Sequence, residues 1–150
     1  MRAPYQILAI PYKRTPELLF CVFHRADCDQ YQFVAGGGED NETPLDAAIR
    51  EIKEEAGITT KSVISLASMA YLPANVISEK HRKYWSEDTF VIPEYAFGFE
   101  CDTAIHLSVE HIGFEWLNYD EAQSRLTWDS NKTALWKTNI CILNLTKTVF

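Results

Sequence analysis

The sequence predicts an α+β fold, and three observations predict it. Most apolar runs are short and rich in aromatic and β-branched residues, which is typical of strands. One stretch in the middle of the chain, residues 44–56, has a clear helical periodicity, and two further helical stretches come near the end. At 150 residues, without a repeat or linker, the chain is expected to form one domain over residues 1–150.

The first elements are expected to be strands. Apolar runs at residues 5–13 and 17–25 are separated by Arg14-Thr15-Pro16, as in a hairpin. A short third strand at residues 31–35 leads into a glycine loop at residues 36–38. We expect this loop to turn sharply and bring the backbone close to a ligand or metal.

The central helix has a recognisable start and stop. Thr43 can act as the N-cap, and Pro44 is tolerated at the first helical position. Gly57 can adopt the left-handed conformation that ends helices. The expected buried stripe consists of Leu45, Ala48, Ile49, Ile52 and Ala56.

The second half is expected to add three strands and two helices. The strands are predicted at residues 62–71, 88–100 and 112–117, and the helices at residues 120–126 and 131–143. Between the first two of these strands lies a long segment with a dense basic run, Lys80-His81-Arg82-Lys83. A loop there could fold over phosphates, although for any single basic residue a solvated loop is the simpler explanation.

The composition indicates a soluble globular protein rather than a nucleic-acid or membrane protein. The net charge of −7 and the pI near 5.0 disfavour a nucleic-acid groove, which needs a basic surface. The N-terminal stretch does not resemble a signal peptide, and no run is long enough to cross a membrane. The four cysteines lack metal-type spacing, so we expect free thiols and a cytoplasmic protein.

Three glutamates give the central helix an acidic side. Glu51, Glu54 and Glu55 follow i, i+3 and i+4 spacing, and Ala47 one turn earlier should leave open space beside them. Arg50 precedes Glu54 by four residues and can pair with it. Clustered carboxylates suit Mg²⁺ or Mn²⁺. Taken alone, the run also fits an ordinary helix with a solvated acidic face.

The wider pattern decides between these two interpretations. The stretch GGGEDNETPLDAAIREIKEEAGI, residues 36–58, meets every specified position of G-x5-E-x7-R-E-U-x-E-E-x-G-U, where U is apolar. In this it resembles the Nudix (MutT-like) hydrolase family. The resemblance implies a mixed β-sheet sandwiched between helices, with the motif forming a loop–helix–loop. It also implies hydrolysis of nucleoside diphosphates linked to another moiety, with water and Mg²⁺ or Mn²⁺.

The resemblance also assigns roles by position. Glu51, Glu54 and Glu55 would be metal ligands, and the backbone carbonyl of Ala35 would be an extra ligand. Arg50 would hold the glutamate array. Glu42 would support the loop or an outer metal position.

Such enzymes often take a base or ligand from outside the motif. We favour Glu110 for this role over Glu115, because strand alternation places Glu115 at an exposed position. A surface carboxylate is an equally good explanation of Glu110. His111 could touch phosphate, but a loop histidine is more often merely solvated.

Other segments bear on the substrate. Residues 31–33, 110–117 and 130–132 resemble the dihydroneopterin triphosphate diphosphatase branch, often labelled dATP pyrophosphohydrolase. This implies that a metal-activated water hydrolyses a (deoxy)nucleoside triphosphate or dihydroneopterin triphosphate to the monophosphate and pyrophosphate. The substrate would be a small phosphorylated molecule. The expected contacts are Arg25, Gln32, Gly36, Gly37, Arg82 and Lys83.

Two alternatives remain open. One is a dinucleoside polyphosphate hydrolase, and the other is a non-catalytic nucleotide-binding module. The intact glutamate array disfavours the second. The sequence leaves open whether the protein is a monomer or a homodimer.

Overall fold

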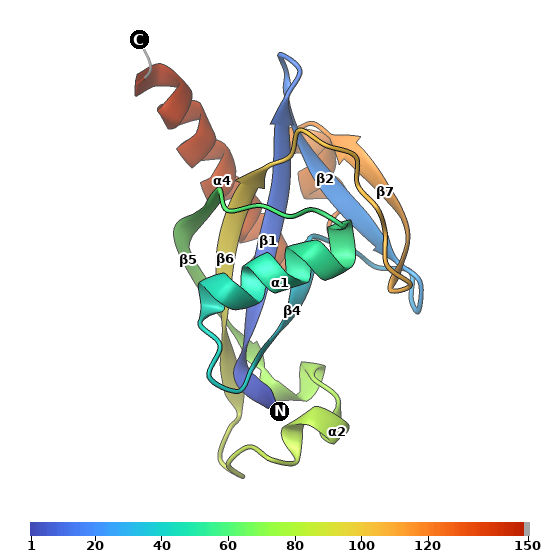
Figure 1. Ribbon diagram of the computed structural model, residues 1–150, viewed down its shortest axis with the longest axis vertical. Coiled ribbons are helices and arrows are strands. Elements are labelled where there is room, and N and C mark those ends of the chain that lie inside the picture. Colours follow the sequence, from blue (N-terminus) through green and yellow to red (C-terminus); the bar gives the residue numbers. More distant parts are fainter. Residues whose placement is uncertain (149–150) are drawn as a thin grey trace.

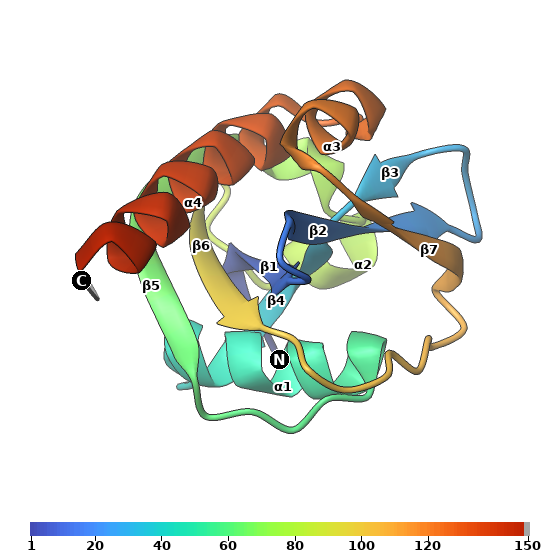
Figure 2. The ribbon, with the colours of Figure 1, turned by 90° about the horizontal axis from the view of Figure 1, so that it is seen from above.

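The structure, a computed structural model, describes residues 1–148 of the chain, with side chains up to residue 144. Seven strands form one sheet, and helices cover both of its faces (Figures 1 and 2). The strands are β1 (Arg2–Arg14), β2 (Leu18–Arg25), β3 (Tyr31–Gln32), β4 (Val34–Glu39), β5 (Val63–Pro73), β6 (Val91–Glu100) and β7 (His111–Leu117). The helices are α1 (Pro44–Ala56), the short 3₁₀ turn η1 (Ala74–Val76), α2 (Glu79–Arg82), α3 (Tyr119–Arg125) and α4 (Asp129–Thr148).

The sheet is mixed, as the fold prediction required. The main path runs β3-β2-β1-β6-β5, while β4 pairs with β1 and β7 pairs with β2. Only β1 and β6 run parallel among the pairs of described strands, and the other pairs are antiparallel. Strand β1 therefore has three partners and forms the centre of the sheet.

Strand β1 explains why helices are needed on both faces. Its residues from Ile7 to Tyr12 are all buried, and successive side chains point to opposite sides. Leu8 and Ile10 pack in the same apolar cluster as Leu135 of α4. On the other side, Ala9 packs with Ile52 of α1. Figure 2 shows α1 and α4 on these opposite faces.

Helix α1 begins and ends where the sequence predicts. The Thr43 hydroxyl accepts a hydrogen bond from the Asp46 amide at 3.2 Å. Gly57 has φ of 71°, and its amide donates to the Lys53 carbonyl at 3.0 Å.

The predicted buried stripe of α1 is partly wrong. Leu45 is 43% exposed, whereas Ala47, expected to leave open space, is fully buried against Ile7 and Phe97. The buried face is rotated toward the acidic side and includes Glu55. Small alanine side chains let the helix approach the sheet closely, and this carries Glu55 into the interior.

Most predicted elements are confirmed, and two segments differ. The expected strand and glycine loop at residues 31–38 are two strands, β3 and β4, so the three glycines lie within a strand that pairs with β1. The expected loop between residues 71 and 88 contains η1 and α2, and the basic run falls in and just after α2. Trp85 ties this segment to β1, because its indole nitrogen donates to the Arg2 carbonyl at 2.8 Å.

Two smaller expectations concern membranes and cysteines. No helix among the described residues is long and apolar enough to cross a bilayer. Cys21, Cys28, Cys101 and Cys141 are all free thiols.

Candidate active site

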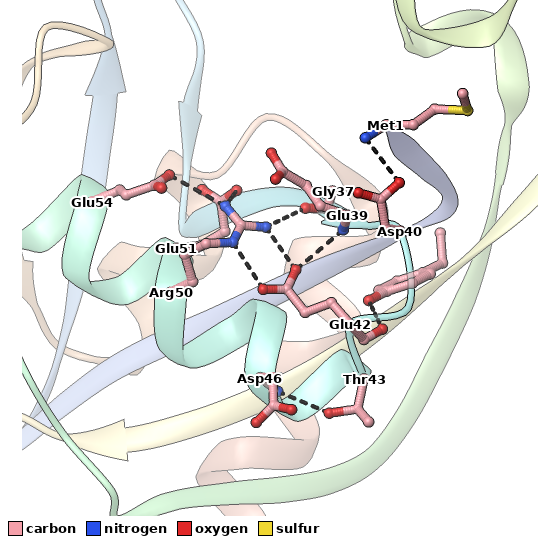
Figure 3. A network of polar contacts seen from close by, with 11 residues as sticks. Met1, Gly37, Glu39, Asp40, Glu42, Thr43, Asp46, Arg50, Glu51 and Glu54 are labelled. Atoms are coloured by element: carbon pink, nitrogen blue, oxygen red, sulfur yellow. Dashed lines mark hydrogen bonds and ion pairs between the residues drawn. The ribbon is translucent and has the colours of Figure 1, made fainter. Parts of the chain in front are cut away.

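Arg50 links the acidic residues of α1 to the end of β4 (Figure 3). Its Nε and one terminal nitrogen donate to the two carboxylate oxygens of Glu42 at 3.0 and 2.9 Å. That second nitrogen also donates to the Gly37 carbonyl at 2.8 Å. The other terminal nitrogen reaches Glu51 at 3.0 Å and Glu54 at 3.3 Å. One guanidinium thus fixes three carboxylates and a strand.

Glu42 fixes the turn between β4 and α1. Besides its bonds to Arg50, its carboxylate accepts the Glu39 amide at 3.1 Å. The Tyr5 hydroxyl donates to the backbone carbonyl of Glu42 at 2.7 Å. Hydrogen bonding from Arg50 lowers the pKa of Glu42. The structure therefore places Glu42 in a loop-supporting position, the first of the two predicted roles.

The glutamates of α1 lie close together, and Arg50 is the cation that pairs with two of them. Burial raises the pKa of Glu51 to about 7, against the opposing effect of Arg50. Burial, together with a hydrogen bond to Glu110, raises the pKa of Glu55 to about 10. Glu55 also accepts the Ala35 amide at 3.0 Å. Glu54 is different, because its side chain is 57% exposed and pairs with Arg50.

A cavity of about 610 Å³ lies beside the buried carboxylates of α1. Glu51 and Glu55 reach it from α1, and Glu110 reaches it from the turn before β7. The N-terminal end of α4 borders the same cavity through Ser130 and Asn131. The cavity therefore joins the acidic cluster to the start of the C-terminal helix.

The glycines of β4 make room for side chains of the site. A Cβ built on Gly36 would lie 2.2 Å from the Glu51 carboxyl carbon. A Cβ on Gly37 would lie 1.7 Å from Arg2 Nε. Either contact is far too short, so any larger residue would displace Glu51 or Arg2. The glycines are thus needed for close approach within a strand rather than for a turn.

Most predicted site residues border this cavity. They are Arg25, Gln32, Ala35, Gly36, Gly37, Glu51, Glu55 and Glu110. The predicted residues Arg50, Glu54, Arg82 and Lys83 do not. Arg82 Nε donates instead to the Ile77 carbonyl at 2.7 Å, and the Lys83 ammonium lies over the Tyr84 ring. From the basic run only His81 borders the cavity. Arg25 is held by Asp27 through two bonds of 2.8 and 2.6 Å.

Arg2 and Glu94 border the cavity although neither was predicted as a site residue, and His111 borders it in a different environment from the one expected. Arg2 is partly buried, its Nε has no hydrogen-bond partner among the described residues, and burial lowers its pKa. His111 is 5% exposed rather than solvated, and neither ring nitrogen has a described partner. Glu94 is 4% exposed. A lone charge within the aromatic run of β6 could have identified Glu94, because unpaired carboxylates are rarely buried.

The acidic side chains of the site have the ligand chemistry that a hard divalent cation prefers, although their oxygens do not converge on one point. Glu51, Glu54, Glu55 and Glu110 offer only oxygens, which Mg²⁺ and Mn²⁺ prefer. Burial, and to a lesser degree the neighbouring carboxylates, raise the pKa values of Glu51 and Glu55 and so disfavour their charged forms, a cost that a bound cation would offset. Within the described residues no three acidic, histidine or cysteine side chains already form a metal-binding group.

Comparison with known proteins gives a family match over most of the chain. A family model described as the NUDIX domain matches residues 7–136. An ADP-ribose pyrophosphatase from Haemophilus influenzae is 27% identical over 116 residues, which are 65% of this chain and 54% of that protein. The chain thus spans about half the length of this curated relative.

Two solved structures are similar over nearly their full length. A NUDIX hydrolase described as putative, from Listeria monocytogenes, is 38% identical with a TM-score of 0.80 and covers 95% of this chain and 96% of its own. The Escherichia coli dihydroneopterin triphosphate pyrophosphohydrolase is 25% identical with a TM-score of 0.73 and covers 89% and 93%. Both share the mixed sheet with flanking helices.

Proposed function

The chain belongs to the Nudix family, and from this we propose that it hydrolyses a phosphoric anhydride bond of a small nucleotide-type substrate. The observation that carries the proposal is a group of carboxylates on and beside α1. Arg50 bonds Glu42, Glu51 and Glu54, while Glu51, Glu55 and Glu110 line one end of the cavity. The similarity to a dihydroneopterin triphosphate pyrophosphohydrolase supports a (deoxy)nucleoside or pterin triphosphate, cleaved to monophosphate and pyrophosphate.

The acidic cluster is proposed as the place where a divalent cation binds. Glu51, Glu54, Glu55 and the Ala35 carbonyl would hold Mg²⁺ or Mn²⁺, as the family resemblance implies. When bound, the cation supplies charge neutralisation of the phosphates and activation of the attacking water. Arg50 does not need to touch the substrate, because its bonds to Glu51 and Glu54 orient these carboxylates.

Metal binding has a readout that does not depend on activity. A cation that binds only the folded protein raises its melting temperature with concentration. We expect millimolar MgCl₂ to raise the melting temperature of the wild type and to raise that of Glu51→Gln less. Glu100→Gln, on the exposed end of β6, should respond like the wild type. Equal shifts of the melting temperature in all three proteins would show that Glu51 is not a metal ligand.

Glu110 is proposed as the general base. Its side chain borders the same cavity as Glu51 and Glu55 but comes from the turn before β7, outside the motif helix. Its carboxylate oxygen would accept a proton from the attacking water.

The phosphates need donors from the same cavity. Arg2 and Arg25 border it as cations, and the Gly36–Gly37 segment brings backbone close to the cluster without side chains in the way. Arg2 is the better placed of the two to gain a partner, because its Nε is unpaired among the described residues whereas Arg25 is paired with Asp27. Gln32 adds an uncharged donor and acceptor.

A substrate panel tests the proposal. The purified protein with MgCl₂ is given dATP, dGTP, dihydroneopterin triphosphate, ADP-ribose and diadenosine tetraphosphate, with phosphate and pyrophosphate detected separately. We expect pyrophosphate release from at least one triphosphate. Cleavage of diadenosine tetraphosphate alone would favour a dinucleoside polyphosphate hydrolase, and no turnover of any compound would favour a binding module.

A further inference from the structure

A buried carboxyl group lies in the cavity away from the acidic cluster. Glu94, on β6, borders the 610 Å³ cavity and also a smaller one of about 390 Å³. The smaller cavity is bordered by Trp128 and Ser130 but by none of the cluster residues Glu51, Glu55 and Glu110. Glu94 therefore marks the end of the cavity next to the start of α4.

Glu94 has few partners inside the protein. Its described polar partner is the Ser130 hydroxyl, and no described cation pairs with it. Burial raises its pKa. A carboxylate can accept about four hydrogen bonds, so most of its acceptor capacity is unused. Such a group normally costs stability, which suggests that its partner is a ligand.

The surroundings suit a flat heterocycle. Trp128 borders both cavities and is 39% exposed as a residue, so its indole is available to stack on a ligand. Leu72 and Ile77 provide apolar contacts on the β5 and η1 side. A planar ring bound between these side chains would present one polar edge to Glu94.

The hydrogen-bonding capacity of a carboxylate determines which edge of a ring it binds best. Its two oxygens both accept, so the best partner is a pair of adjacent donors. We propose that Glu94 determines base specificity by accepting the ring N–H and the exocyclic NH₂ of a 2-amino-4-oxo heterocycle, as in guanine or a pterin. This inference rests on the proposed function of the same cavity and narrows its substrate class.

Other bases fit this carboxylate less well. Adenine and cytosine place an acceptor nitrogen next to their exocyclic amino group, and this nitrogen would face the second oxygen of Glu94. Thymine and uracil have one N–H between two carbonyl groups. Only the 2-amino-4-oxo edge satisfies both oxygens of Glu94 at once.

The wild type gives the first test. We expect kcat/KM for dGTP and for dihydroneopterin triphosphate to exceed that for dATP by about 10–100-fold, the discrimination of a bidentate pair. Comparison of dGTP with dihydroneopterin triphosphate shows whether the preferred ring is guanine or a pterin, because both present the same edge to Glu94. A wild type that prefers dATP overturns the inference, whatever any variant does. No turnover of any compound would instead count against the proposed function.

Variants at Glu94 give the second test. Glu94→Gln has nearly the same shape but offers one acceptor and one donor, so the dGTP:dATP ratio of kcat/KM should fall about 10–100-fold. Glu94→Asp retains the carboxylate and should keep the preference at reduced kcat/KM. Glu100→Gln, an exposed carboxylate of the same strand, should leave the ratio unchanged. An equal loss for dGTP and dATP in Glu94→Gln would indicate a structural role and overturn the inference.

Binding of the products makes the test independent of catalysis. Calorimetry with dGMP and dAMP should show tighter binding of dGMP to the wild type, and this difference should disappear in Glu94→Gln. If Glu94→Gln does not fold, the wild type and Glu94→Asp still decide the matter, because both must favour dGMP. A wild type that binds the two nucleotides equally contradicts the proposed role of Glu94.

Discussion

Arg50 and Glu42 lie eight residues apart and form a two-bond ion pair, with both carboxylate oxygens of Glu42 accepting from one guanidinium at 3.0 and 2.9 Å. The same guanidinium reaches the Gly37 carbonyl and two glutamates of α1. The turn, the glycine strand and the acidic helix are therefore held by one side chain. Only a planar group with several donors can make these contacts together.

Arg50→Lys should consequently be a severe change although the charge is kept. A lysine ammonium cannot bridge Glu42, Gly37 and the helix glutamates at once, so we expect a loss of about 1–3 kcal/mol in the free energy of unfolding. Urea denaturation measures this loss in the free energy of unfolding. Arg125→Lys is the control, because Arg125 pairs with Glu115 at the surface and should cost little. Equal losses in the two variants would contradict this role of Arg50.

Glu54→Gln should separate catalysis from stability. The Glu54 side chain is 57% exposed and contacts Arg50 at 3.3 Å, so its loss should change the free energy of unfolding by less than about 0.5 kcal/mol. As a proposed metal ligand, its loss should lower kcat on the order of 10²–10⁴-fold. Pyrophosphate release and urea denaturation give the two values. Asp46→Asn, at the exposed start of the same helix, should retain kcat, and an active Glu54→Gln would exclude the role.

The sequence predicted the acidic helix well because its signals are local. Capping residues and i, i+3, i+4 spacing depend on neighbours in the chain, so Thr43, Gly57 and the glutamates were found at the right places. The rotation of the helix was not predictable in this way. Whether Leu45 or Ala47 faces the sheet depends on how closely the helix packs on β1, which is a tertiary effect.

The rest of the site depends on contacts between distant segments. The three glycines were expected to form a loop, because glycine usually marks a turn. Their actual neighbours, including Arg2 and Glu51, come from β1 and α1, which only the fold brings to β4. Glu94 and Trp128 likewise border the same cavity only because the fold brings β6 and the residue before α4 to it. Motif spacing therefore predicted the acidic end of the cavity. The end formed by Glu94 and Trp128 could be identified only from the structure.

The metal-free protein should lose stability as the pH rises above about 5. The pKa of Glu51 is raised by burial from 4.5 to about 7, so the folded state holds its proton more tightly than the unfolded state. That stabilisation is complete below about pH 4.5 and is lost as the pH rises through 7. In excess chelator, the free energy of unfolding of the wild type should fall by about 1–3 kcal/mol more than that of Glu51→Gln between pH 5 and 8. Parallel curves for the two proteins would show that Glu51 ionises normally.

Gly37→Ala should damage the site through Arg2. The new Cβ would lie 1.7 Å from Arg2 Nε, so the guanidinium must leave its place beside the cluster. We expect a loss of about 1–3 kcal/mol in the free energy of unfolding and a higher KM, because a proposed phosphate contact is displaced. Gly113→Ala, where a Cβ would meet nothing within 4 Å, is the matched control.

The double variant Gly37→Ala/Arg2→Ala shows whether Arg2 is the cause. Once the guanidinium is absent, the alanine at position 37 no longer meets it, so adding Gly37→Ala to Arg2→Ala should cost much less stability than adding it to the wild type. KM should be similar in Arg2→Ala and in the double variant, because both lack the same contact. Additive losses in stability would instead mean that Gly37 is needed for the conformation of β4 itself. Displacement of Arg2 would then not be the cause of the loss in Gly37→Ala.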